Sequence, residues 1–594
     1  MIIPELVRLY DRLAAEGDQT LAPDGYSRQK ISFKVVLKPD GGLHGLEPVQ
    51  VSIPSGRGGA PKSQPVAMLV PGQAKASGSG LNPGFLWDNA AYLLGFKADD
   101  EKPERTRKAF DAFRDRHLAV EKEINDAGFT AVARFLRAWE PGEAGGQLEL
   151  KAITKHFGVF QICGELGFVH ERPKVQSWWN DQLDLPEGNR GEPAPVAPSL
   201  VTGEFEPVAR LHEPKIKGIA NAQSAGALIV TFNKAAFSSY GKEQGHNAPV
   251  GESDAFKYCT ALNRLTTDNR HRVHIGPDTY VFWTAGEQSM DNAMSGWFAA
   301  ALDDSALTDE RLQGIMEAVC GGAPITEFGD LTTPFYVLGL SSNNARLAVR
   351  TWLASTIGEV AERVKRHHDG LAIEPTPGDR PRLSIRSLVS ETVPARGGFP
   401  DEKAINPTLA SGLARSILEG TPYQRALFSG VLNRVRLEGL VDRDKRKDWR
   451  AAGHRRCAII RACLTRNHRM EVPMALDTDR ADPPYLLGRL FAVLEQTQHN
   501  ALGDINRTIK DSYYGSASAT PAAIFPRLVS CSRHHLSKME SRGQRIKREK
   551  ELGSIMDRLM EFPRTLSMEA QGLFAIGYYH QRQSYFARSQ ESAS

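Results

Sequence analysis

The chain has 594 residues, of which 41% are hydrophobic and 24% charged, and its formal net charge is +4. This composition is ordinary for a soluble globular protein, and no run approaches the roughly 18 apolar residues that span a bilayer. Its 6 cysteines include no C-x-x-C pair, which excludes the usual zinc and redox spacings and fits a reducing cytoplasm. We therefore expect a cytoplasmic protein of several domains with no membrane contact.

The first half of the chain mixes helix and strand patterns. The N-terminal segment 1–17 carries charges throughout and predicts an amphipathic helix rather than a signal peptide. Runs rich in β-branched and aromatic residues predict strands at Ile31–Leu37 and Ala227–Phe232, and a hairpin over Arg272–Thr284. A helix is expected to begin near Ser253.

After about residue 340 the apolar residues recur at helical spacing. The pattern predicts helices over 346–367, 427–435, 487–509 and 552–559. The expected fold is an α+β N-terminal portion over 1–340, followed by a mainly α-helical C-terminal portion. The latter comprises a helical, basic region at 341–469 and a helical bundle at 470–594.

Positive charge is concentrated in two blocks of the C-terminal portion. Residues 425–469 contain 13 Lys and Arg against 4 Asp and Glu, a local charge of +9, whereas the rest of the chain sums to −5. Residues 527–550 hold 8 basic and 2 acidic residues. A polyanion is the natural partner of such blocks, although solvated helix faces would give the same pattern.

The cations that we expect to contact a nucleic-acid backbone come from both blocks. The last three below are spaced i, i+4, i+7, which predicts one helical face. They are Arg434, Arg436, Lys445, Arg446, Lys447, Arg455, Arg456, Lys538, Arg542 and Arg545.

A polar loop at residues 238–250, SSYGKEQGHNAPV, precedes the helix expected near Ser253. Between Phe237 and Ala248 it has no aliphatic side chain, so it cannot contribute to a core. Tyr240 could stack on a base and Lys242 could meet a phosphate, while Gln244 and Asn247 could read base edges. A solvated Ω-loop is the alternative.

The segment Gly25–Lys30 resembles that loop in composition. It offers an aromatic, a hydroxyl, an amide and cations immediately before the strand expected at Ile31–Leu37. The candidate contacts are Tyr26, Ser27, Gln29 and Lys30. Composition leaves two interpretations open: a turn that leads into the strand, or a second reading loop.

The sequence contains no strong catalytic motif. The phosphate-binding loop, H-E-x-x-H and G-x-S-x-G patterns are all missing. His367, His368 and Asp369 include a His-Asp doublet of the kind found in metal-dependent phosphohydrolases, but one doublet cannot fill a metal shell. We expect a non-enzymatic binding protein without metal or cofactor; the alternative is a metal-dependent nuclease that uses this cluster.

Six segments, taken in order, resemble a known family, the large subunit of the type I-C CRISPR interference complex (Cascade). The resemblance spans nearly the whole chain from about Tyr10. The segments are GYSRQKISF, FLWDNAAYLLG, SSYGKEQGHNAPV, NNARLAVRTWL, LFSGVLNRVRLEG and YLLGRLFAVLEQTQHNAL.

This resemblance implies a role in antiviral defence. Such subunits sit at the 5′-handle end of a CRISPR RNA, beside the backbone and handle-binding subunits of Cascade. They recognise the protospacer-adjacent motif (PAM) on foreign double-stranded DNA, support duplex opening and R-loop formation, and help recruit a helicase-nuclease. The polar loops would then recognise the motif and the basic blocks would follow DNA or RNA phosphates. A rival interpretation is a structural scaffold whose basic patches only hold RNA.

Some family members also produce a small subunit from an internal start. Met470 and Met474 lie just after the first basic block, and a product from either would contain the expected bundle. Its basic stripe would suit the displaced single strand. Both methionines could equally be ordinary core or loop residues.

Overall fold

The computed structural model describes residues 1–18, 20–55, 59–73, 80–98, 100–142, 157–184, 195–302, 330–375, 383–440, 449–503 and 508–591. The chain divides into two compact units. The N-terminal unit comprises Met1–Gly218 and Gln223–Arg264, and the C-terminal unit comprises Ile219–Ala222 and Leu265–Ser594. Each unit is described by itself.

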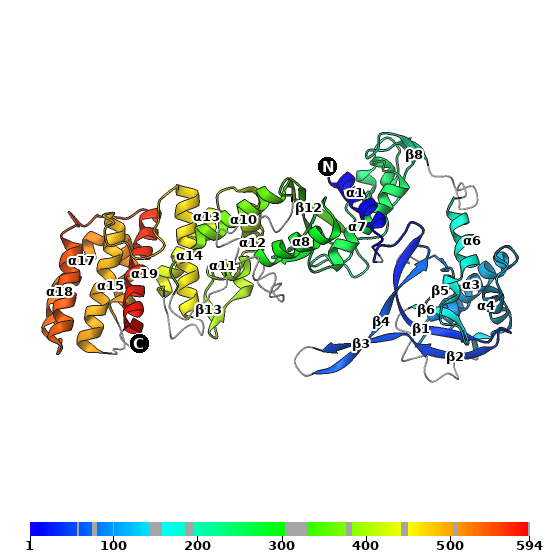
Figure 1. Cartoon of the computed structure of the whole chain (residues 1–594), viewed down its shortest axis with the longest axis horizontal. Coiled ribbons are helices and arrows are strands. Elements are labelled where there is room, and N and C mark those ends of the chain that lie inside the picture. The colour runs from blue at the N-terminus through cyan, green and yellow to red at the C-terminus, as the bar shows by residue number, and fades with distance from the viewer. Residues whose placement is uncertain are drawn as a thin grey trace. The chain divides into compact units, whose positions relative to one another are not determined.

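The N-terminal unit combines helices with a mainly antiparallel sheet (Figure 1). In chain order its elements are α1 (Ile2–Ala15), β1 (Tyr26–Leu37), β2 (Leu43–Pro48), β3 (Gln50–Ser55), β4 (Gly59–Pro71), β5 (Trp87–Asp88), α2 (Ala90–Leu93), α3 (Pro103–Ile124), α4 (Ala127–Ala138), β6 (Phe157–Ile162), α6 (Pro173–Asp184), β7 (Val196–Pro198), β8 (Phe205–Pro207) and α7 (Glu252–Thr267), whose last residues pass into the other unit.

Strand β1 organises the sheet of this unit. The strand order is β3-β4-β1-β6-β5, and β2 also pairs with β1. The first half of β1 pairs antiparallel with β4, and its second half lies between β2 and the parallel strand β6. Since β1 has partners on both sides, it is buried along most of its length.

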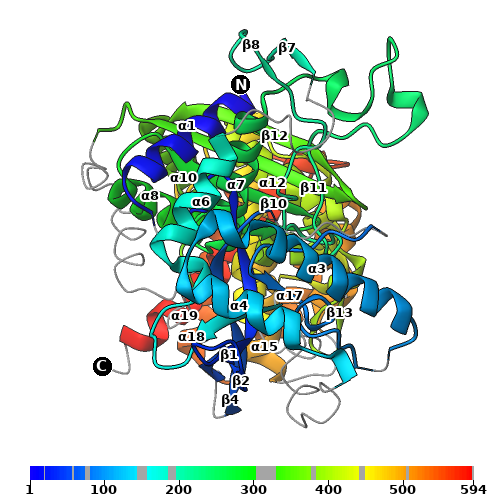
Figure 2. The ribbon, with the colours of Figure 1, turned by 90° about the vertical axis from the view of Figure 1, so that its right-hand side faces the viewer.

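The hydrophobic core of the N-terminal unit lies between this sheet and three helices. Figures 1 and 2 show α3, α4 and α6 grouped together beside the sheet, and α4 contacts both β1 and β6. Phe33, Val35 and Leu37 of β1 meet aromatic residues of the helices in one buried cluster that includes Phe110 and Phe129. These apolar residues alternate along β1 and therefore share the face of the strand that meets the helices.

Several sequence predictions for this unit are confirmed. The N-terminal helix is α1, and its buried residues Leu6, Leu9, Tyr10 and Leu13 form one face. The strand predicted at 31–37 is the second half of β1, and the helix expected near Ser253 is α7.

The strand predicted at Ala227–Phe232 is wrong. There, Ile216 and Ala227 form one isolated antiparallel bridge, in which each N–H donates to the other residue's carbonyl at 2.9 Å. Gly226 precedes the bridge at φ 89°. A run of β-formers becomes a strand only where a neighbouring strand continues the ladder, and residues 227–232 form bridges but no strand.

The C-terminal unit begins with a four-stranded sheet and continues as helices. Its elements are β9 (Arg272–Ile275), β10 (Asp278–Thr284), α8 (Gln288–Leu302), β11 (Pro334–Asn343), β12 (Arg346–Thr356), α10 (Ile357–Leu371), α11 (Ile385–Ser390), β13 (Ala395–Arg396), β14 (Phe399–Pro400), α12 (Pro407–Glu419), α13 (Arg425–Glu438), α14 (Trp449–His468), α15 (Pro483–Leu502), α16 (Ile509–Ala519), α17 (Pro521–Ser537), α18 (Arg542–Met556) and α19 (Met568–Glu591).

The predicted hairpin over Arg272–Thr284 is confirmed as β9 and β10 in a sheet ordered β12-β11-β10-β9. The helix predicted over 346–367 is half wrong, because residues 346–356 form β12, which pairs with β11 over its whole length. Helix α10 starts only at Ile357, where the Thr356 side chain accepts the Glu359 N–H. Alternating residues such as Leu347, Val349 and Thr351 suit a strand, and pairing with β11 decided the outcome.

The expected fold class is confirmed, with an α+β N-terminal portion and a helix-rich C-terminal portion. One continuous hydrophobic cluster extends from Phe282 on β10 through α10–α14 to Tyr579 on α19. The helical region expected at 341–469 and the bundle expected at 470–594 therefore share a core.

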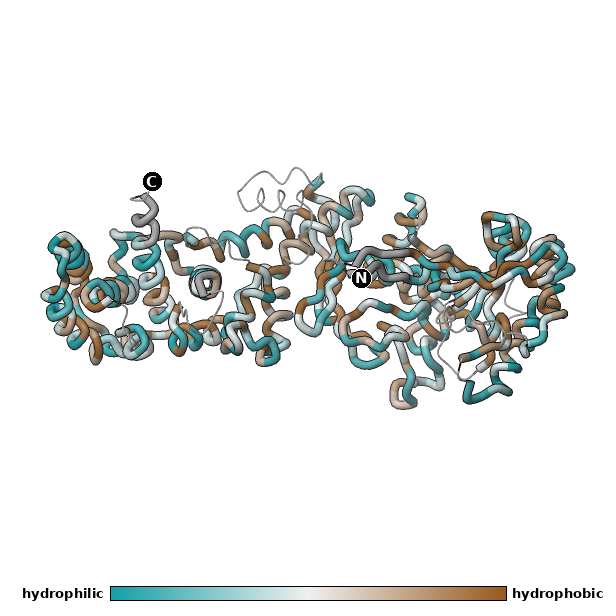
Figure 3. The backbone as a smooth tube through the Cα atoms, turned by 90° about the horizontal axis from the view of Figure 1, so that it is seen from below, coloured by the Kyte–Doolittle hydropathy of each residue, from teal (hydrophilic) through white to brown (hydrophobic). Residues whose placement is uncertain are grey.

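Hydrophobic and hydrophilic residues alternate along the helices at the C-terminal end (Figure 3). Among the described residues, none of the helices has both the length and the apolar character that crossing a bilayer requires.

Helices α15 and α19 approach so closely that glycine is required at two positions. A Cβ atom at Gly488 would overlap the carbonyl oxygen of Phe574, and one at Gly577 would overlap that of Tyr485. Gly553 on α18 has no heavy atom within 4 Å of the place where its Cβ would be. The crossing of α15 and α19 is therefore set by backbone contact.

We predict that Gly488→Ala and Gly577→Ala each destabilise the C-terminal bundle by about 2 kcal/mol or more, because the added methyl group forces the helices apart. The matched variant Gly553→Ala should be neutral or stabilise by about 0.5–1 kcal/mol, since alanine favours an exposed helix interior. Thermal unfolding of the full chain measures both. Equal melting midpoints for all three variants would contradict the close crossing.

Candidate nucleic-acid interface

The polar loop at residues 238–250 is anchored at its base. The Gly245 N–H donates to the Arg210 carbonyl at 2.8 Å, and the Ala209 N–H donates to the Val250 carbonyl at 2.9 Å. A Cβ at Gly245 would overlap the Ala209 carbonyl oxygen, so only glycine permits this approach. The base of the loop is thus held against residues 209–210.

Asn247 holds the loop together from within. Its Oδ1 accepts the Ser239 N–H at 2.8 Å, and its Nδ2 donates to the carbonyls of Lys242 at 2.9 Å and Gln244 at 3.0 Å. All the hydrogen-bonding atoms of the amide therefore serve the loop backbone. In this conformation Asn247 braces the loop, and both of its Nδ2–H donors are already used, so it cannot donate to a base edge in the way that the sequence had led us to expect.

The braced loop presents Tyr240 and Lys242 to solvent. The Tyr240 side chain is 97% exposed, and Lys242 is exposed beside it. Tyr240 and Gln244 take left-handed backbone conformations, with φ of 52° and 47°, which non-glycine residues adopt only when the surroundings impose them. The structure thus leaves Tyr240, Lys242 and the half-buried Gln244 as candidate contacts.

The second candidate loop is not a loop. Residues 26–30 are the first part of β1 and pair with β4. Tyr26, Ser27 and Gln29 are buried, and only Lys30 of the four candidates is exposed. The Tyr26 hydroxyl donates to Asn180 Oδ1 at 2.8 Å and Gln29 Nε2 donates to Ser27 Oγ at 3.0 Å.

Burial also raises the pKa of Tyr26. Its hydroxyl therefore stays protonated as the hydrogen-bond donor to Asn180. The backbone of this segment is paired with β4, and the side chains of Tyr26, Ser27 and Gln29 are buried and hydrogen-bonded. The interpretation of the segment as a second reading loop is therefore wrong.

Two arginines of the first basic block are core residues. Arg455 Nε donates to Glu391 Oε1 at 2.7 Å, and Arg456 Nε donates to Glu391 Oε2 at 3.1 Å. Arg456 also reaches Glu438 at 2.6 Å. Arg455 and Arg456 are 7% and 1% exposed, so their expected contact with phosphates is corrected to an internal ion-pair network.

The remaining cations of that block differ in exposure. Arg434 is half-buried and pairs with Glu438 at 2.9 Å, whereas Arg436 on the same helix, α13, is exposed. The candidates Lys445, Arg446 and Lys447 lie outside the described residues.

The second block does not form one helical face. Lys538 follows the last residue of α17, and Arg542 is the first residue of α18. The Ser541 side chain accepts the Gln544 N–H and so starts a new helix between them. Lys538 and Arg542 are nevertheless exposed, and Arg545 is half-exposed, 4.0 Å from Glu549.

The histidine pair lies at the buried side of α10. His367 Nδ1 is 2.7 Å from the Tyr423 hydroxyl, and burial holds the pKa of His367 well below its usual value. Burial also lowers the pKa of His368 to about 4, against the opposing charge of Asp369. Within the described part of the chain, no group of three or more His, Cys, Asp or Glu residues is placed to hold a metal ion.

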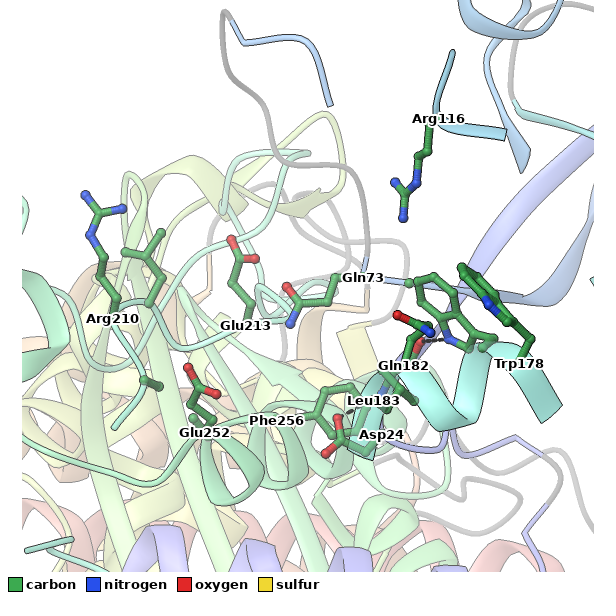
Figure 4. Close-up of a pocket in the computed structure, with 16 residues that line it drawn as sticks. Asp24, Gln73, Arg116, Trp178, Gln182, Leu183, Arg210, Glu213, Glu252 and Phe256 are labelled. Carbon is green, nitrogen blue, oxygen red and sulfur yellow. Dashed lines mark hydrogen bonds between the residues drawn. The ribbon is translucent and has the colours of Figure 1, made fainter. Parts of the chain in front are cut away.

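One cavity of the N-terminal unit was not predicted. Its volume is about 660 Å³, and Figure 4 shows its lining side chains. They include Trp178 and Trp179 of α6, Arg210 and Glu213, and Phe256 of α7. The adjacent indoles are a sequence signal for such a wall, but an aromatic pair of this kind is more often part of a core.

The chain is thus an α+β unit followed by a mainly helical unit, with an exposed, internally braced polar loop in the first. The model of one protein family matches residues 6–586 and is described as CRISPR-associated protein (Cas_Csd1). Because the match covers nearly the whole chain, the protein belongs to this CRISPR-associated family. The search of curated proteins returned no match.

We predict that Asn247→Asp loosens the loop. A carboxylate still accepts the Ser239 N–H but cannot donate to the carbonyls of Lys242 and Gln244, so two hydrogen bonds are lost. Amide hydrogen exchange over residues 238–250 should become about tenfold faster. The exposed residue Asn233 offers a matched control, Asn233→Asp, which should leave exchange unchanged. Unaltered exchange in Asn247→Asp would contradict the brace.

A second prediction compares the buried Arg456 with the exposed Arg436. Arg456→Ala removes one of the two arginines that each of Glu391 and Glu438 contacts, leaves the buried network short of one positive charge, and should cost about 3 kcal/mol of stability. Arg436→Ala, on the exposed surface of α13, should change stability by less than about 0.5 kcal/mol. Thermal unfolding of the full chain compares them, and an unchanged melting midpoint for Arg456→Ala would contradict its core role.

Proposed function

We propose that this protein is the non-catalytic large subunit of a type I-C Cascade and recognises the PAM on foreign double-stranded DNA. The observation that carries this proposal is the braced loop 238–247, which holds an almost fully exposed tyrosine beside an exposed lysine. Membership of the CRISPR-associated family supplies the context, and the six resembling segments supply the subtype.

The loop chemistry suits recognition of a short motif. Lys242 can pair with a phosphate and hold the loop in register, while the Gln244 amide can donate to and accept from a base edge. The Tyr240 ring can pack against a base or sugar at the same place. Few contacts are needed, because pairing between guide RNA and target strand provides the remaining specificity.

A rigid loop is an advantage for this task. The three hydrogen bonds of Asn247 fix the backbone from Ser239 to Gln244 before DNA arrives. Binding then requires less ordering of the loop, so more of the contact energy remains for discrimination between motifs.

Surface cations of the C-terminal unit suit a second role. Arg436, Lys538 and Arg542 are exposed and can attract nucleic-acid phosphates with an affinity that falls as salt rises. We assign them to the guide RNA or the displaced strand during R-loop formation. The Cascade backbone and handle-binding subunits and a recruited helicase-nuclease complete the proposed set of partners.

Two further parts of the proposal concern the chain itself. The absence of catalysis is supported by the buried, hydrogen-bonded position of His367. A small subunit from an internal start at Met470 or Met474 would contain α15–α19, whose core is continuous with α13 and α14. That product would therefore need another apolar surface to cover the face that these two helices cover here.

The loop is tested in the assembled complex, on duplexes that carry every possible adjacent motif. Lys242→Ala should weaken binding to all motifs alike and reduce the slope of log affinity against log salt by about 0.9, because one phosphate contact is lost. Gln244→Ala should instead reduce the preference between motifs by about 1–3 kcal/mol.

Lys122→Ala serves as the matched control, since Lys122 is an exposed lysine on α3. It should change neither quantity. If Lys242→Ala and Gln244→Ala both leave affinity and motif preference at the wild-type values, the loop is not the reader.

A further inference from the structure

The cavity of the N-terminal unit has the size and the mixed chemistry of a ligand site. Its volume of about 660 Å³ lies within the range of small-molecule sites, roughly 300–1,000 Å³. Aromatic, acidic and basic side chains all line it (Figure 4).

One wall is aromatic, and its rings are held by stacking contacts and hydrogen bonds. The rings of Trp178 and Trp179 lie 5.2 and 5.0 Å from the ring of Phe85, measured between centroids. Trp179 Nε1 donates to the Gly25 carbonyl at 3.0 Å, and Trp178 Nε1 donates to Glu123 at 3.1 Å. Both indole N–H groups are therefore occupied. Because Trp179 is 8% exposed, the flat apolar surface that this wall offers a ligand comes mainly from the half-buried ring of Trp178.

The cavity also presents carboxylates. Glu213 is half-buried, and burial raises its pKa against the opposing charge of Lys215. Across the described parts of the chain, Glu213 makes no hydrogen bond or ion pair. Asp24 and Glu252 add two more acidic side chains to the lining. A partly desolvated carboxylate that faces a cavity without a partner favours a ligand with hydrogen-bond donors.

Two arginines complete the lining. Arg116 donates to the Pro83 carbonyl, and Arg210 is exposed at the cavity rim. With three carboxylates among the same side chains, the lining does not suit a simple phosphate ion. With two guanidinium groups it does not suit a simple cation either. A ligand that joins a donor-rich aromatic ring to an anionic group satisfies all three kinds of lining.

We propose that this cavity binds one unpaired guanine nucleotide, with the base against Trp178, its N1–H and N2–H₂ donors on Glu213, and its phosphate, at the opposite end of the base, near Arg116 (Figure 4). Guanine is favoured because its Watson–Crick edge carries two adjacent donors, which match the two oxygens of one carboxylate. Adenine and cytosine each carry one such amino group, and uracil carries none. Within the proposed function, the nucleotide would belong to the guide RNA or to an opened DNA strand.

Saturation-transfer NMR on the full chain tests the site with GMP, AMP, CMP and UMP as probes. GMP should show the strongest transfer to its base protons and the lowest dissociation constant, and guanosine should bind more weakly than GMP. Glu213→Gln should weaken GMP binding about tenfold and leave UMP unchanged. Glu204→Gln, at an exposed glutamate outside the cavity, should alter neither.

Single-stranded RNA and DNA octamers with one guanine in a uridine or thymidine background identify the source of the nucleotide. Guanine-dependent binding of either octamer that is lost in Glu213→Gln supports the site. Equal transfer to all four mononucleotides, or wild-type GMP affinity in Glu213→Gln, overturns it. These measurements use no PAM, so they do not depend on PAM recognition. Lys242 and Gln244 lie outside the cavity, so the test of PAM recognition does not depend on the nucleotide site. Failure of one proposal can therefore be told from failure of the other.

Discussion

Polar groups that leave water must find partners inside the protein, and this constraint decides which polar residues of the chain remain available for a ligand. Glu391 is fully buried and lies between Arg455 and Arg456, so two cations of the basic block are held in the core. His367 is bound to Tyr423 and Tyr26 to Asn180 for the same reason. Residues that the sequence offered as candidates for ligand contact are thus used to stabilise the fold.

The need of polar groups for hydrogen-bond partners also explains the structure of the candidate recognition loop. Asn247 satisfies three backbone groups of a segment that lacks apolar side chains and so cannot be held by a core. The brace leaves Tyr240 and Lys242 exposed, and it converts a polar stretch into a rigid surface. A rigid surface loses little conformational entropy on binding, which is what recognition of a short motif with few contacts requires.

The loop and the cavity belong to the same unit but differ in the chemistry that they offer. The loop is exposed to solvent, which suits contact with the edges and phosphates of a duplex. The cavity is concave, walled by indoles that pack against Phe85, and carries a carboxylate that lacks a partner among the described residues. It therefore suits a single base outside a duplex. Under the proposed function, the protein would meet both forms of nucleic acid.

The sequence by itself determined the fold class, the helices α1, α7 and α13, the β9–β10 hairpin and the position of the exposed loop, because periodicity and turn residues are local signals. Pairing with neighbouring strands decided the structure of other segments. Residues 346–356 became β12 because β11 lies beside them, and residues 26–30 became part of β1 because β4 does. Tertiary contacts also separated buried Arg456 from exposed Arg436 and assembled the cavity from distant segments. Whether a side chain is buried depends on neighbours from distant parts of the chain, which the local sequence does not specify.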